Sequence, residues 1–166
     1  MRAITAALLL ILAPTPVVAA SDCSTATANQ PLAHVGEVKQ IISRLAALRN
    51  SSLDSDHKLV MQQRLFGRLE KLGSTAVPAI IAQMDDERPL AVPQISLENR
   101  FPGAFEGVRH YGPELIVDAL DAVLNQITGE SFGFIGNGGS TEDRRKAVLG
   151  WRGYAAKLAC RGANPR

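Results

Sequence analysis

The fold is decided by residues 59–86, LVMQQRLFGRLEKLGSTAVPAIIAQMDD, which predict two helices separated by a single break. Apolar residues recur three and four apart before Gly73, and glycine is the residue type that most often ends a helix. The apolar pattern resumes beyond the break, where Pro78 is acceptable because it falls in or near the first helical turn. We therefore expect a helix that is capped by Asp54 or Asp56 and runs to about Leu72, and a shorter helix over 74–86, packed together as an antiparallel hairpin.

Three other stretches show the same helical spacing, and we see no convincing strand pattern in the sequence. These stretches cover residues 34–49, 113–129 and 140–158. In the second of them, Asp118 and Asp121 fall opposite the apolar stripe, so we expect them on a solvated face. The sequence thus predicts an all-α fold of about five helices, a short stack of antiparallel helix hairpins. We expect a single domain over residues 34–160, an extended lead-in over 21–33 and a C-terminal tail over 161–166.

One part of the chain resembles a HEAT-like repeat. In residues 69–86 a first helix closes with Leu-Gly, a second opens with Ala-Val-Pro, and the segment ends in two aspartates. Residues 126–133, QITGESFG, followed by Trp-Arg at 151–152, are similar to the ends of uncharacterised bacterial exported HEAT-like proteins. The resemblance implies a helical protein with a curved surface that binds other proteins, and it implies no particular catalytic activity.

Residues 1–20 have the pattern of an export signal. Arg2 supplies a positive charge, residues 4–13 form an apolar run too short to span a bilayer, and residues 18–20 are small enough for a cleavage site. We expect residues 1–20 to be a signal peptide and the protein to be periplasmic or secreted. No second long apolar run follows, so we expect no stable membrane insertion after the signal is removed.

The chain has two cysteines, Cys23 and Cys160. An even pair in an exported chain usually forms a disulfide, and this pair would join the two ends of the mature domain. We predict a Cys23–Cys160 disulfide; the alternative is that both residues are buried thiols.

Charge and motif content argue against several classes of function. The formal net charge is only +2, which provides no basic surface for nucleic acid. The histidines are His34, His57 and His110, too far apart in the sequence to suggest a metal site. The glycine-rich loop over 132–140 leads into a helix with an acidic first turn that would repel phosphate, so we interpret it as a connector. We predict no catalytic residue, no metal ligand, no cofactor and no nucleic-acid partner.

The strongest candidate for a binding site is the stretch over 87–111, which loses helical periodicity and is longer than common loops. It is rich in arginine and aromatic residues, which bring large contact areas and forked hydrogen-bond donors to protein interfaces. The alternative is that Phe101 and Phe105 only anchor the loop to the core. The predicted partner-binding residues are Arg88, Asn99, Arg100, Arg109, His110 and Tyr111, with Asp118 and Asp121 of the nearby helix.

Two functional hypotheses remain open from the sequence. The first is an exported, non-enzymatic helical module that binds a periplasmic or extracellular protein, for example as an inhibitor or immunity-type protein. The second is a cell-wall or glycan-acting enzyme or binding factor that uses Glu98, Glu106 and His110. The second hypothesis requires a concave pocket that holds these three side chains within about 10 Å. The partner and the oligomeric state are not predicted.

Overall fold

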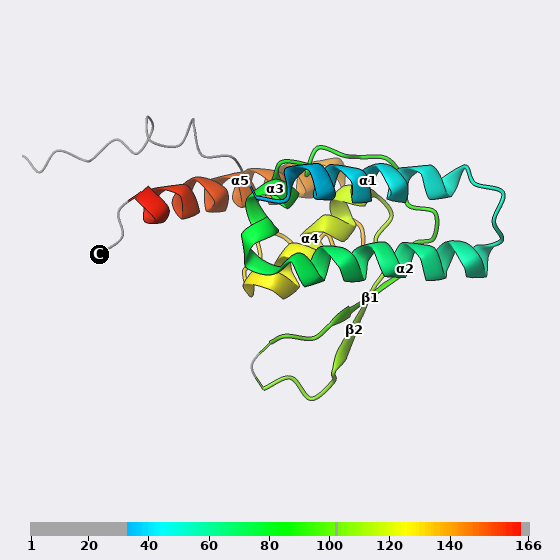
Figure 1. The fold of residues 1–166 in the computed structure, drawn as a ribbon. Coiled ribbons are helices and arrows are strands. Elements are labelled where there is room, and N and C mark those ends of the chain that lie inside the picture. The colour runs from blue at the N-terminus through cyan, green and yellow to red at the C-terminus, as the bar shows by residue number, and fades with distance from the viewer. Residues whose placement is uncertain (1–32, 102, 164–166) are drawn as a thin grey trace, which may run out of the picture.

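The computed structural model describes residues 33–101 and 103–163, and Figure 1 shows a body of helices from which a β-hairpin extends. The predicted signal peptide, most of the lead-in, Cys23 and the last three residues lie outside the described residues. The helices are α1 (Val35–Arg49), α2 (Ser55–Leu72), the 3-10 turn η1 (Gly73–Ala76), α3 (Val77–Ile81), α4 (Ile116–Thr128) and α5 (Thr141–Ala163), and the strands are β1 (Ile95–Glu98) and β2 (Val108–Tyr111).

The predicted break at Gly73 is present. The long helices α1 and α2 precede it, and the much shorter α3 follows it. Helix α1 and helix α2 pack side by side, and α2 begins where the Asp54 carboxylate accepts a hydrogen bond from the backbone N–H of His57 at 2.9 Å. Gly73 ends α2 with φ at 65°, a left-handed value that glycine adopts without a steric penalty. The third segment differs from the prediction of a helix over 74–86, because α3 stops at Ile81 and turns follow it. The predicted hairpin across Gly73 is also wrong, since the helix that packs along α2 is α1.

The prediction of an all-α stack of helix hairpins is wrong, because residues 87–111 contain a two-stranded antiparallel sheet. Strand β1 pairs with β2, with Ile95 opposite Tyr111 and Leu97 opposite Arg109. Ile95 and Leu97 are buried, so one face of this short sheet packs on the core. Four residues are too few for an alternating pattern to stand out in a sequence, which is why the stretch resembles an irregular loop.

Side chains of α2 take the place of a third strand along the outer edge of β1. The amide of Gln63 accepts a hydrogen bond from the backbone N–H of Ser96 and also donates to the Ser96 carbonyl oxygen. Two turns further along α2, the carboxylate of Glu70 accepts from the N–H of Glu98 at 3.1 Å. Strand β1 therefore has hydrogen-bond partners along both of its edges, β2 on one and side chains of α2 on the other. These bonds fix the base of the hairpin against the helical body.

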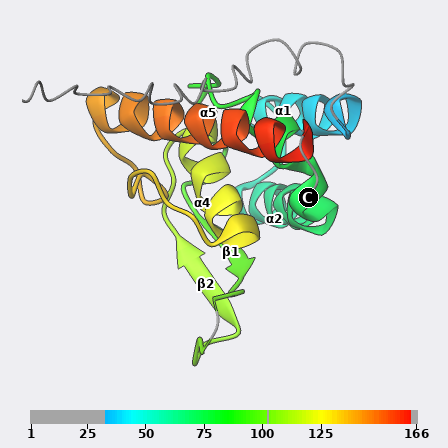
Figure 2. The same ribbon diagram turned by 90° about the vertical axis from the view of Figure 1, so that its left-hand side faces the viewer.

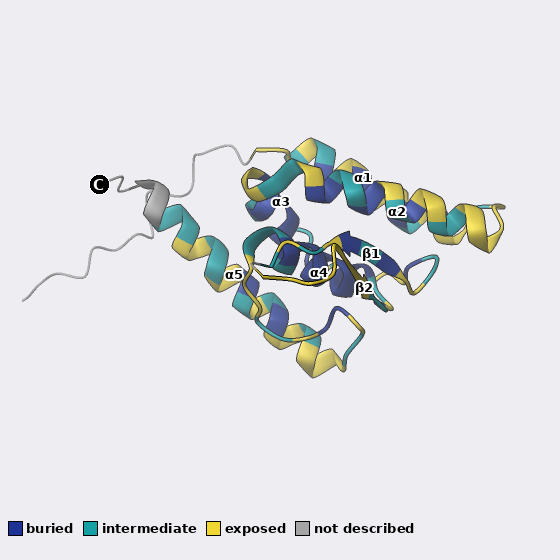
Figure 3. Cartoon of the chain, turned by 90° about the horizontal axis from the view of Figure 1, so that it is seen from below, coloured by how far each residue is buried: buried dark blue, intermediate teal, exposed yellow. Residues whose placement is uncertain are grey.

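Helix α4 is the centre of the core and contacts α1, α2, α3, α5 and β1. Figure 3 shows it as a mostly buried element between the others, and Figure 2 shows α5 running across one side of it. Asp118 and Asp121 are 0% and 4% exposed, so the solvated face predicted for them is not present. A helix packed on all sides buries its polar positions too, and the apolar stripe alone does not show this.

Helix α5 provides the polar partners that let α4 bury two aspartates. Arg144 donates from Nε to Asp118 at 2.7 Å, and the indole N–H of Trp151 donates to Asp121 at 2.7 Å. Cys160 is half-buried near the end of α5, and because Cys23 is outside the described residues the disulfide stays a prediction. No helix among the described residues is long and apolar enough to span a membrane.

Candidate functional site

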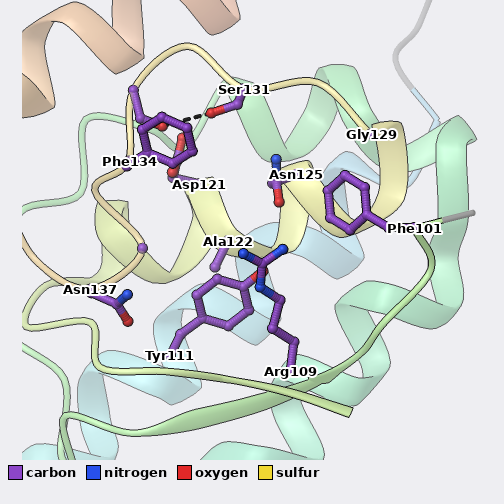
Figure 4. A pocket seen from close by; sticks show the side chains of 12 residues that line it. Phe101, Arg109, Tyr111, Asp121, Ala122, Asn125, Gly129, Ser131, Phe134 and Asn137 are labelled. Atoms are coloured by element: carbon purple, nitrogen blue, oxygen red, sulfur yellow. Dashed lines mark hydrogen bonds between the residues drawn. The ribbon is translucent and has the colours of Figure 1, made fainter. Parts of the chain in front are cut away.

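A pocket of about 290 Å³ opens where β2, α4 and the glycine-rich loop meet (Figure 4). Its wall combines three aromatic rings with an arginine, a carboxylate and two side-chain amides. The lining residues are Phe101, Arg109, Tyr111, Asp121, Ala122, Asn125, Gly129, Ser131, Gly133, Phe134, Gly136 and Asn137.

Arg109 is held between two aromatic rings at one side of the pocket. Its guanidinium carbon lies 5.5 Å from the centroid of the Phe101 ring and 5.6 Å from that of the Tyr111 ring, and Figure 4 shows the group turned into the pocket. The Tyr111 hydroxyl accepts a 2.6 Å hydrogen bond from the amide of Gln126, whose oxygen accepts from the backbone N–H of Arg100. Since Gln126 is buried in α4, the ring stack is anchored to the core.

The glycine-rich loop forms the opposite wall because it comes very close to β2 and α4. A Cβ atom on Gly136 would lie 3.0 Å from Tyr111 and 3.3 Å from Ala122, so only glycine fits there without a shift of the neighbours. The Asn137 side chain accepts a hydrogen bond from the backbone N–H of Gly112 at 2.8 Å. Phe134 is 92% exposed and lies at the end of the pocket away from Phe101.

Asp121 is the buried acid of the pocket. Burial raises the pKa of its carboxyl group to about 6, and the negative charge of Asp118 adds to this increase. Hydrogen bonds from the Trp151 indole and from the backbone of Ile135 favour the ionised form and oppose the increase. The Asp121 carboxylate is therefore already occupied by donors from α5 and from the loop.

The structure brings together only some of the predicted partner-binding residues. Arg109 and Tyr111 line the pocket with Asp121, and Arg100 borders a neighbouring cavity. Arg88 is elsewhere and pairs with Asp86, which its side chain contacts at 2.5 Å.

The other predicted residues have structural partners. Asn99 accepts a bond from the backbone N–H of Phe101 at 3.4 Å, and Asp118 accepts from the backbone at the start of α4 and pairs with Arg144. His110 lies on the other face of the hairpin, because alternate residues of a strand point to opposite sides, and there it hydrogen-bonds Ser96 at 2.8 Å.

The residues of the glycan hypothesis lie outside the pocket over α4. Glu98 pairs with Arg100 at 3.0 Å and is largely exposed, as is Glu106 beyond the strands. Neither residue, nor His110, lines the pocket over α4. Among residues 33–101 and 103–163, no group of three or more His, Cys, Asp or Glu side chains could hold a metal ion.

Sequence reasoning missed the part of the site that comes from the glycine-rich loop, and from α4 it indicated Asp121 but not Asn125. Phe134 and Asn137 are absent from the predicted binding residues because the loop over 132–140 reads as a connector in the sequence. One signal in the sequence could have indicated this part of the site, namely Phe134 between glycines. A large apolar side chain that is exposed on a loop often marks a binding surface.

The fold and the pocket define a helical body with a docked β-hairpin and a polar-aromatic site between hairpin, central helix and loop. No family model, curated protein or solved structure matches this chain. The resemblance of residues 69–86 to a HEAT-like repeat is therefore an untested prediction.

Proposed function

We propose that this protein is an exported, non-enzymatic module that binds another protein outside the cytoplasm, and that the hairpin and the glycine-rich loop form its binding face. The observation that carries the proposal is the exposure of large aromatic side chains on the two non-helical segments, one on the loop that lines the pocket and one on the segment that joins the strands. Phe105 is fully exposed in the segment that joins the strands, and Phe134 is 92% exposed on the loop.

Exposed aromatic side chains beside an arginine are the composition of a protein-binding hot spot. Aromatic rings bury a large area on contact and lose little conformational freedom, and arginine adds directional donors. Val108 on β2 is also about half-exposed, and the hairpin extends clear of the helices in Figure 1. These side chains contribute little to the core, so their exposure favours a role in binding.

The proposal is tested by affinity capture from periplasmic extract with variants that change only exposed side chains. Phe105→Ser and Phe134→Ser remove apolar contact area, while Leu149→Ser on α5 is the matched control because Leu149 is 60% exposed and outside the binding face. All three variants should keep the thermal stability of the wild-type protein, since none removes a buried group.

We expect one protein to be retained by the wild type and by Leu149→Ser and to be lost with Phe105→Ser and Phe134→Ser. Truncation of a hot-spot aromatic costs about 2 kcal/mol or more, so retention should fall about thirtyfold. Retention of the same proteins by all four forms, or of none by the wild type, would contradict the proposal.

A further inference from the structure

We propose that the pocket binds a carboxylate group on a peptide segment of the partner, and that Arg109 is the residue that recognises it. This inference rests on the proposed function and adds the chemistry of the group that the pocket accepts. Three observations support it: Arg109 lacks, among the described residues, the carboxylate partner that most other arginines have, two aromatic rings flank its guanidinium group, and side-chain amides with unused donors line the same pocket.

Arg109 differs from most other arginines of the protein in having no acidic partner. It forms no ion pair with any residue among 33–101 and 103–163, although it lines a pocket. Arg44, Arg49 and Arg64 have no acidic partner there either, but all three are exposed on helices outside the pocket, and Arg49 donates to the carbonyl oxygen of Leu90. The arginines that pair with carboxylates are Arg68, Arg88, Arg100, Arg144, Arg145 and Arg152.

The Arg109 side chain is held in place before any ligand arrives. Two aromatic rings flank its guanidinium group, and the hydrogen bond from Gln126 fixes one of these rings. Arginine presents its N–H groups as a planar fork that matches the two oxygens of a carboxylate. Because the stack limits the rotamers of Arg109, less conformational entropy is lost when a carboxylate binds.

Neighbouring amides complete a site for a peptide group. Asn137 uses its oxygen to accept from Gly112, which leaves its NH₂ group as a donor. Asn125 donates one N–H to the carbonyl oxygen of Glu130 at 2.8 Å, which leaves its oxygen and a second N–H for a ligand. A carboxylate that contacts Arg109 would thus find further donors on the pocket wall, and an adjoining peptide N–H would find an acceptor.

The negative charge of Asp121 does not exclude anions from the pocket, but it favours a singly charged anion over a doubly charged one. Asp121 is buried and bonded to Trp151, whereas Arg109 is exposed and unpaired, so the accessible charge of the pocket is positive. A doubly charged phosphate would be repelled by Asp121 more strongly than a singly charged carboxylate. The rings of Phe101 and Phe134 also offer contact to an apolar side chain next to the carboxylate, which inorganic phosphate lacks.

The proposal is tested by NMR titration of isotope-labelled protein with N-acetylphenylalanine and with its uncharged amide, N-acetylphenylalaninamide. The two probes differ only in the carboxylate, and inorganic phosphate and the neutral, N-acetylated form of the disaccharide chitobiose serve as comparison ligands. Arg109→Gln removes the proposed recognition group, and Arg64→Gln is the matched control because Arg64 is also exposed and unpaired but lies on α2.

We expect saturable shifts at residues 109–111 and 133–137, with the acid binding about tenfold or more tightly than the amide. Arg109→Gln should abolish this preference, and Arg64→Gln should leave it unchanged. Equal binding of acid and amide, tighter binding of phosphate or chitobiose, a preference that survives in Arg109→Gln, or the absence of saturable shifts would overturn the inference. Loss of the carboxylate preference with intact partner capture would leave the proposed function standing, whereas failure of capture would refute that function independently.

Discussion

At the scale of single residues, Asp121 shows how this protein keeps a carboxylate in its interior. Hydrogen bonds from α5 and from the glycine-rich loop only partly offset the cost of burying its charge, and its pKa is therefore raised to about 6. The same side chain forms part of the pocket wall. The buried acid thus links the packing of α5 to the electrostatics of the site.

The raised pKa predicts how stability depends on pH. The folded protein holds the Asp121 proton more tightly than the unfolded chain, in which the pKa is near 3.8. This contribution to stability is fully present below pH 3.8 and is lost as the pH rises through about 6. The increase in the pKa from 3.8 to about 6 corresponds to a difference of about 3 kcal/mol in the free energy of unfolding.

We predict that Asp121→Asn raises the free energy of unfolding at pH 8 by up to about 3 kcal/mol and has little effect near pH 4, because asparagine resembles the protonated acid. Urea denaturation from pH 4 to pH 8 measures this difference. Glu106→Gln is the control, since Glu106 is exposed. A constant offset between wild type and Asp121→Asn at every pH would argue against a raised pKa.

The roles of Asp118 and Asp121 could not be predicted from their own helix. Both residues are spaced as on a solvated face, so the pattern within the helix gives no reason to expect them to be buried. Their partners, Arg144 and Trp151, lie about 25 to 30 residues away in the sequence. Arg109 and Tyr111, in contrast, were predicted as site residues because arginine and tyrosine are typical of binding surfaces wherever they occur.

At the scale of elements, the join between α5 and the glycine-rich loop depends on a glycine within a helix. Phe132 packs on Trp151 with ring centroids 4.9 Å apart, and its side chain crosses α5 at Gly150. A Cβ atom on Gly150 would lie 2.3 Å from the Cβ of Phe132, which is closer than real contacts allow. The missing side chain lets the loop, and with it the pocket wall, lie against the helix.

We predict that Gly150→Ala lowers the free energy of unfolding by about 1–2 kcal/mol, because the steric cost exceeds the gain in helix propensity of about 1 kcal/mol. Gly153→Ala is the matched control on the same helix, where nothing lies within 4 Å of the added atom, and it should stabilise the protein by up to about 1 kcal/mol. Thermal denaturation compares the two variants. Stabilisation by both would show that Phe132 does not pack against α5 in this way.

Helices were predicted more accurately than strands for a physical reason. The helices α1, α2 and α5 bury a stripe that repeats over several turns, so their apolar spacing is visible in the sequence. Strand β1 contributes only two buried residues, Ile95 and Leu97, and most of β2 is exposed. The edge pairing of β1 with Gln63 and Glu70 depends on side chains far away in the sequence, so no local pattern indicates it.

At the scale of the whole molecule, the helical body positions a hairpin and a loop so that a pocket forms between them. Helix α4 underlies both, and α2 and α5 hold the hairpin base and the loop from two sides. The exposed phenylalanines lie on these two segments, Phe134 on the loop that lines the pocket and Phe105 between the strands of the hairpin. The central claim is that this face, and no helical face, contacts the partner.

Site-specific photocrosslinking in the producing cell tests that claim most directly. A benzophenone amino acid replaces Phe134, Phe105 or, as the control, Leu149; all three positions are exposed, so the replacement should leave the fold intact. We predict one discrete protein adduct from positions 134 and 105 and none from position 149. Adducts of equal yield from all three positions, or an adduct from position 149 alone, would contradict the account.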